Sequence, residues 1–241
     1  MNNEKKPFDL KSLVKKPSDI RKKNMKMIVY AKSFTGKTFF ATNNPTYKTL
    51  VLDLESGTGG LENRENVDVI PIEDVTKFKQ VLEALEKNCP YDLVVIDSFT
   101  KYSEMLYAVL TKIYPEKKDS MLLWNTLDLK FRQYYELLLK LDANVIITAL
   151  EELYAPEGMP YAIRYPMIKA KKFKEYMPSQ ADIVAYMNID KDNIRTIYLK
   201  PSREYISKNR FERFFKVDEI KQDDELFSFE NLHKAILNSI N

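Results

Sequence analysis

The chain has 241 residues, of which 44% are hydrophobic and 30% charged, with a formal net charge of +3. This composition is typical of a folded globular protein, and the charge is too small for a chain that coats nucleic acid over its whole surface. The only cysteine, Cys89, excludes an internal disulfide and a cysteine-based zinc site. The only histidine, His233, which we expect at the surface, argues against a Ser-His-Asp hydrolase.

The chain shows neither an apolar run long enough to span a bilayer nor the apolar core of a signal peptide at its start. We therefore expect a cytoplasmic protein without a membrane partner. The pattern predicts a lysine-rich arm over residues 1–25, a main domain over residues 26–217 and a helical tail over residues 218–241. The arm is interpreted either as a solvated tail or as a basic segment that binds DNA or a neighbouring subunit.

The segment from Ala31 to Thr38 follows an apolar run at residues 27–30 and precedes a predicted helix. Its Gly36-Lys37-Thr38 ending is that of a P-loop, in which backbone N–H groups surround phosphates. The lysine then contacts the β- and γ-phosphates of ATP, and the threonine hydroxyl ligates Mg²⁺. Ala31 replaces the first glycine of the motif and is expected to alter the entry of the loop. The predicted nucleotide-binding residues are Ala31, Lys32, Ser33, Phe34, Thr35, Gly36, Lys37, Thr38 and Phe39.

Apolar strands and amphipathic helices alternate along the chain up to residue 150, which predicts a mainly parallel sheet flanked by helices. After residue 150, a hairpin or loop, a lysine-rich helix and two antiparallel strands indicate an antiparallel C-terminal extension. The predicted strands cover residues 49–55, 67–70, 92–98, 144–149, 183–187 and 194–199. One predicted helix starts at Asp74, and the others cover residues 100–113, 121–142, 169–177 and 228–240.

Acidic residues end two of the predicted strands. Asp97 follows an apolar strand, which is the position of the aspartate that holds magnesium opposite Thr38. Because Ser98 follows it, the glutamate that AAA+ ATPases carry next to this aspartate is absent. Glu55 is the predicted residue that orients the attacking water, and Asp53 is the alternative, since strand alternation puts both on one side.

Together these residues resemble the RecA-like ATPases, which combine a P-loop, a glutamate after the second strand and an aspartate without a neighbouring glutamate. Further on, Lys208-Asn209-Arg210-Phe211 resembles the Lys-Asn-Arg-Phe motif of RadA and the basic finger of DnaB-type helicases. The resemblance implies that Lys208 and Arg210 reach the γ-phosphate of a neighbouring subunit, where positive charge stabilises the transition state. The alternative is an exposed basic turn.

Over roughly residues 25–215 the chain is most similar to small phage-encoded RecA-like ATPases of the fourth Sak group of single-strand annealing proteins. This resemblance implies a RecA-like P-loop fold, ATP and Mg²⁺ as cofactors, and action on single-stranded DNA in phage recombination or replication inside a bacterial host. It also implies a homo-oligomer, as ring or filament, with a single-strand binding protein as a further partner. Leu150 stands where such proteins carry a polar sensor residue, and Thr148 or Glu151 is the expected substitute.

The predicted DNA contacts follow the strand at 144–149. The expected phosphate-binding side chains are Arg164, Lys169, Lys171, Lys172 and Lys174, and the expected base-stacking ones are Tyr154, Tyr161 and Tyr165. The alternative is that these lysines coat a solvent-facing helix. Three other functions stay open: a small-molecule phosphotransferase, a ParA-like ATPase suggested by Lys32, and a nucleotide-gated adaptor that binds ATP with little hydrolysis.

Overall fold

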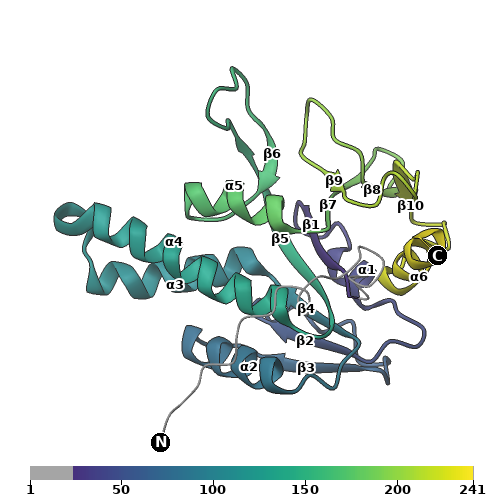
Figure 1. Ribbon diagram of the computed structural model, residues 1–241, viewed down its shortest axis with the longest axis horizontal. Helices are drawn as coiled ribbons and strands as arrows, with labels where there is room; N and C mark the ends of the chain where they lie inside the picture. Colours follow the sequence, from purple (N-terminus) through teal and green to yellow (C-terminus); the bar gives the residue numbers. More distant parts are fainter. Residues whose placement is uncertain (1–23, 241) are drawn as a thin grey trace, which may run out of the picture.

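The structure is a computed structural model that describes residues 24–240 (Figure 1). Most of the expected basic arm, residues 1–23, lies outside the described residues. The helices are α1 (Lys37–Thr42), α2 (Val75–Lys87), α3 (Phe99–Ile113), α4 (Glu116–Lys140), α5 (Lys171–Gln180) and α6 (Phe229–Ile240). The strands are β1 (Lys26–Ala31), β2 (Thr49–Asp53), β3 (Val67–Pro71), β4 (Leu93–Asp97), β5 (Asn144–Tyr154), β6 (Ile163–Pro166), β7 (Ile183–Ile189), β8 (Arg195–Tyr198), β9 (Lys208–Asn209) and β10 (Glu219–Lys221).

The strands form one sheet in which β7, β1, β5, β4, β2 and β3 lie in this order and run parallel. At the β7 end, β8, β9 and β10 extend the sheet in antiparallel pairs. The order reverses at β1: the chain passes first towards β3 and later returns to add β7 on the other side. Ligands of open α/β sheets bind outside the carboxyl ends of the strands at such a reversal.

Helices cover both faces of the sheet (Figure 1). In β1, Ile28 and Tyr30 belong to the cluster beneath α2, α3, α4 and α5, whereas Met27, Val29 and Ala31 belong to the cluster beneath α1 and α6. This alternation follows from the two-residue period of a strand, and both sets are apolar because both faces are covered. The expected fold class, a helix-flanked and mainly parallel sheet with an antiparallel C-terminal extension, is confirmed.

Two elements extend beyond their predicted ends, and for one of them the structure shows a tertiary reason. The strand predicted to stop at residue 149 continues to Tyr154, because its second half leaves the parallel sheet and pairs with β6 as an antiparallel hairpin. This hairpin projects from the sheet beside α5 (Figure 1). The helix predicted from residue 121 begins at Glu116.

The C-terminal segment, expected as a tail, is part of the domain. Strand β10 pairs with β8, and α6 buries Phe229, Leu232 and Ile236 against the sheet. The expectation of a surface histidine was wrong: His233 is buried and its Nδ1 lies 2.8 Å from the Tyr47 hydroxyl. In the part of the chain from residue 24 to 240, no helix combines the length and the apolar character needed to cross a membrane.

Candidate nucleotide-binding site

The predicted P-loop joins the carboxyl end of β1 to the start of α1. Phe34 and Gly36 have positive φ angles of 61° and 95°, so the loop makes the left-handed turns that glycine adopts most easily. A Cβ atom on Gly36 would lie 3.1 Å from the Arg195 side chain, so space as well as conformation favours glycine there. Ala31 is a buried residue of β1 and is not among the described residues with positive φ, so the missing first glycine causes no backbone strain.

Lys37 is buried inside the loop, and its ammonium donates to the Lys32 carbonyl at 2.7 Å and to the Ala31 carbonyl at 3.4 Å. Burial lowers the pKa of Lys37, and the nearby carboxylates of Asp97 and Glu55 oppose this effect. The ammonium is therefore held over the loop by two neutral carbonyl oxygens. Charged phosphate oxygens form stronger hydrogen bonds with an ammonium and can replace these carbonyls.

Thr38 and Asp97 meet across the crevice, with the threonine hydroxyl 2.6 Å from Oδ2 of the aspartate. The other oxygen of Asp97 accepts from the Thr148 hydroxyl in β5, which fixes the carboxylate orientation. A hydroxyl and a carboxylate are hard oxygen ligands of the kind that Mg²⁺ prefers, so this pair fits the ion that accompanies ATP. Between residues 24 and 240 no cluster of three or more His, Cys, Asp or Glu side chains is suited to a metal, and phosphate oxygens would complete the coordination.

Glu55 and Asp53, which strand alternation left equivalent, have different roles in the structure. Asp53 ends β2 and its carboxylate accepts from the Glu55 and Gly57 amides and the Thr58 hydroxyl, so it shapes the loop after the strand. Glu55 lies beyond the strand and accepts from the Ser98 hydroxyl. Ser98 follows Asp97 across a cis peptide bond and also caps α3. A second carboxylate, from the segment after β2, thus reaches the residue that follows Asp97 at the end of β4.

A cavity of about 510 Å³ adjoins the P-loop at Gly36 and Phe39. Its other walls come from Arg195 in β8 and from Gln222, Asp223 and Phe227 after β10. Aromatic rings, a guanidinium and an amide side by side suit the base and ribose of a nucleotide. Sequence analysis missed these residues because they lie more than 150 positions beyond the motif and carry no signature of their own.

The residues expected as fingers lie far from the P-loop of their own chain. Lys208 pairs with Val184 near the amino end of β7, and its ammonium donates to the Ser179 and Ala181 carbonyls at 2.7 and 2.8 Å. The guanidinium of Arg210 forms an ion pair with the buried Asp182 at 2.7 Å. Since the P-loop follows the carboxyl end of β1, parallel to β7, these side chains occupy the opposite edge of the sheet.

The expected DNA-binding cations differ in their surroundings. Lys169, Lys171 and Lys172 are exposed at the start of α5. Lys174 is buried, forms an ion pair with Glu152 at 2.6 Å and lies over the Tyr154 ring. Its ammonium is therefore already neutralised.

Arg164 lies in β6 between two carboxylates, 3.7 Å from Glu151 and 3.3 Å from Glu204. Tyr161 is exposed at the hairpin, whereas Tyr154 donates to Glu175 and packs against Tyr165.

Leu150 occupies the position of the expected polar sensor, and its backbone amide donates to the Thr100 hydroxyl at 2.9 Å. Thr148 bonds to Asp97, as described above. Burial lowers the pKa of Lys37, and Glu151 is close enough for its charge to oppose this effect; Glu151 also faces Arg164. Both expected substitutes therefore lie near the site, and Glu151 also contacts the hairpin through Arg164.

Such an arrangement of loop, lysine, hydroxyl and carboxylates at one sheet edge defines the class of P-loop nucleoside triphosphatases. Residues 23–211, more than half of the chain, match the family described as the AAA domain. The chain belongs to this family and is a nucleotide-binding ATPase domain. No curated protein matches its sequence. Among solved structures, it is similar to a KaiC-like protein from the hyperthermophilic archaeon Pyrococcus horikoshii OT3, with 15% identity, a TM-score of 0.43 and coverage of 75% of this chain and 80% of that chain.

Proposed function

We propose that the chain is an ATP- and Mg²⁺-dependent ATPase that binds single-stranded DNA and acts as a ring or filament in phage DNA recombination or replication. The observation that carries this proposal is the meeting of Lys37, Thr38, Asp97 and Glu55 at one edge of the sheet. A binding lysine, a hydroxyl–carboxylate pair and a further carboxylate are the groups that hydrolysis of a phosphoanhydride requires.

In this mechanism ATP lies with its phosphates in the P-loop, and the Lys37 ammonium exchanges its two carbonyl partners for phosphate oxygens. Thr38 and Asp97 would hold Mg²⁺, which neutralises phosphate charge when bound. Glu55, oriented by the Ser98 hydroxyl, positions a water molecule and accepts its proton as the water attacks the γ-phosphorus. The bond to the leaving oxygen of ADP then breaks, and ADP and phosphate are released.

The same proposal assigns Lys208 and Arg210 to the site of a neighbouring copy. Two observations support this assignment: both side chains lie at the sheet edge opposite the P-loop, and both are held by the segment after α5. The Arg210 side chain remains 46% exposed despite its bond to Asp182, so it is presented at the surface in a fixed orientation. A positive charge delivered in this way stabilises the transition state of phosphoryl transfer.

For DNA, we propose Lys169, Lys171 and Lys172 as phosphate contacts and Tyr161 on the hairpin as a base-stacking side chain. Arg164 is proposed to transmit the state of the nucleotide, because it links Glu151 to the loop at Glu204. Lys174 is proposed to hold the hairpin against α5 through Glu152 rather than to bind DNA directly.

The first experiment measures ATP hydrolysis by the purified protein with and without single-stranded DNA, at low and at moderate salt. We expect DNA to stimulate hydrolysis and the stimulation to fade as salt rises, because phosphate contacts release counterions. Hydrolysis that is indifferent to DNA would refute the DNA part of the proposal. Tight ATP binding without turnover would refute the ATPase and favour a nucleotide-gated adaptor.

A second experiment locates the DNA contacts by replacing Lys169, Lys171 and Lys172 together with alanine. We expect the slope of log Kd for single-stranded DNA against log salt to become shallower by roughly 2, since each lost contact removes about 0.7. The matched control replaces the three lysines of α2, namely the half-buried Lys77 and the exposed Lys79 and Lys87, and should keep the wild-type slope. An unchanged slope in the α5 variant would exclude this surface.

A further inference from the structure

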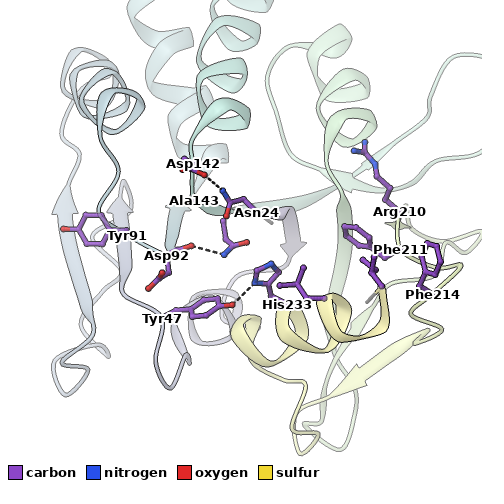
Figure 2. Close-up of a pocket in the computed structure, with 13 residues that line it drawn as sticks. Asn24, Tyr47, Tyr91, Asp92, Asp142, Ala143, Arg210, Phe211, Phe214 and His233 are labelled. Atoms are coloured by element: carbon purple, nitrogen blue, oxygen red, sulfur yellow. Dashed lines mark hydrogen bonds between the residues drawn. The ribbon is translucent and has the colours of Figure 1, made fainter. Parts of the chain in front are cut away.

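A cavity of about 800 Å³ opens at the amino edge of the sheet, away from the P-loop (Figure 2). Two of its lining residues fix this position: Asp92 immediately precedes β4, and Asn144 begins β5. Residues of α6 also line the cavity. Apolar side chains from two segments line it: Phe211 and Phe214 after β9, and Leu237 and Ile240 in α6. An apolar cavity of this size accommodates an aromatic side chain with its neighbours.

The polar residues around the cavity are acidic or already paired. Asp92 and Asp142 are exposed carboxylates at its border, and Asp142 accepts from the Asn24 amide at 2.7 Å. The Tyr47 hydroxyl and His233 bond to each other (Figure 2). The cavity therefore suits an apolar group that is accompanied by positive charge.

The opposite edge of the sheet carries a group of this description. Phe34, in the P-loop, has 96% of its surface exposed, the largest exposed fraction among the large hydrophobic side chains of the described residues. It protrudes because the loop turns through a positive φ at this residue, and the exposed Lys32 lies two positions before it. Neither burial nor phosphate binding requires an aromatic ring there, whereas an exposed ring beside a cation suits a protein contact.

Phe34 cannot reach the cavity of its own chain, because β1 separates the two places. The strand starts at Lys26, whose ammonium bonds to the Leu141 and Ala143 carbonyls beside the cavity, and ends at the P-loop. Six residues of strand span roughly 20 Å at about 3.3 Å each. A contact between the two surfaces therefore joins different copies head to tail, which produces a ring or a filament.

We propose that Phe34 of one copy inserts into this cavity of the next copy, against Phe211 and Phe214, with Lys32 facing Asp92 and Asp142. The contact brings a further group to the site. Arg210 lines the same cavity, so docking of the P-loop carries the nucleotide of one copy to the arginine of the other. This consequence rests on the proposed function, whereas the docking itself rests on the shape and charge of the two surfaces.

The test compares Phe214→Asp with the wild-type chain by analytical ultracentrifugation, in Mg²⁺ and a non-hydrolysable ATP analogue. Phe214 is 55% exposed, so the substitution spares the core. We expect the dissociation constant of the oligomer to rise about 10- to 100-fold, the loss expected when a phenylalanine no longer finds an apolar site. Met121→Asp, at a side chain on α4 that is 78% exposed, is the matched control and should assemble normally.

A mixing experiment tests the head-to-tail geometry. Phe34→Ser removes the inserted ring but keeps the cavity, and Phe214→Asp does the reverse. At a concentration between the wild-type and the variant dissociation constants, we expect each variant alone to be monomeric and their mixture to form a 1:1 dimer. A wild-type chain that stays monomeric, a Phe214→Asp variant that assembles like wild type, or a mixture without dimers would each overturn the proposal.

A photoreactive benzophenone side chain at position 214 identifies the occupant. A cross-link to the P-loop of another copy supports the proposal, and a cross-link to residues 1–23 or to a different protein overturns it. ATP hydrolysis by the mixed dimer separates the two claims. Cross-linked dimers that hydrolyse nothing would refute the proposed ATPase and leave the docking intact, whereas wild-type hydrolysis by monomeric Phe214→Asp would show that docking does not complete the site.

Discussion

The carboxylate of Glu230 holds α6 against the segment that follows α1, and its removal tests this part of the structure. The side chain is only 1% exposed and accepts from the Thr46 amide at 2.7 Å, the Tyr47 amide at 2.9 Å, the Thr46 hydroxyl and the Lys234 ammonium. Burial alone would raise the pKa of Glu230, but these hydrogen bonds outweigh it and lower the pKa from 4.5 to about 2.

The size of the effect follows from linkage. A carboxyl group whose pKa is lower in the folded than in the unfolded protein stabilises the fold above the unfolded pKa, and this stabilisation is lost as the pH falls through the folded pKa. At about 1.4 kcal/mol per pH unit, the fall from 4.5 to about 2 corresponds to about 3 kcal/mol at pH 7 for Glu230. At pH 3 the carboxyl is mostly protonated in the unfolded chain but still mostly ionised in the folded protein. Only about 1.4 kcal/mol of the stabilisation therefore remains.

We therefore expect Glu230→Gln to lower the free energy of unfolding by about 3 kcal/mol at pH 7 and by about half as much at pH 3. Urea denaturation followed by circular dichroism at both pH values measures the two differences. The control is Glu225→Gln, at an exposed position just before α6, which should change stability by less than about 0.5 kcal/mol. A Glu230→Gln variant as stable as wild type at pH 7, or a difference that does not shrink at pH 3, would refute the reasoning.

Four further predictions concern the candidate nucleotide site and the finger. Lys37→Ala should abolish ATP binding, measured by calorimetry, and retained binding would exclude the lysine as a phosphate ligand. Glu55→Gln should bind ATP but hydrolyse it about 10² to 10⁴ times more slowly, in single-turnover assays; an unchanged rate would point to another base. Arg210→Ala should bind ATP normally and lose turnover, and full turnover would exclude the finger role. Gly36→Ala should lower the free energy of unfolding by about 1–2 kcal/mol, because its φ is positive and its new Cβ meets Arg195; an unchanged urea midpoint would contradict this.

Much of the core could be predicted from local patterns. The apolar runs that became β1, β2 and β4 are buried on both faces and needed no tertiary information to be recognised as strands of a parallel sheet. The spacing of Lys37, Thr38 and Asp97 was equally informative, because parallel strands bring their carboxyl ends to a common edge. Sequence therefore determined the fold class and the candidate nucleotide site, since both depend on periodicity and on short motifs.

Tertiary structure alone decided what each charged side chain does. Asp53 and Glu55 are two positions apart, yet one organises a loop and the other accepts from Ser98, which lies between β4 and α3. Lys174 looked like its exposed neighbours in sequence, but Glu152 and the Tyr154 ring enclose it. The reason is physical: hydrogen bonds and ion pairs depend on partners tens of residues away, and no local pattern encodes the distance between them. The same holds for the contact of Arg195 with the P-loop and for the cavity at Phe214. These features form only once β8 has paired with the sheet and α6 has packed against it.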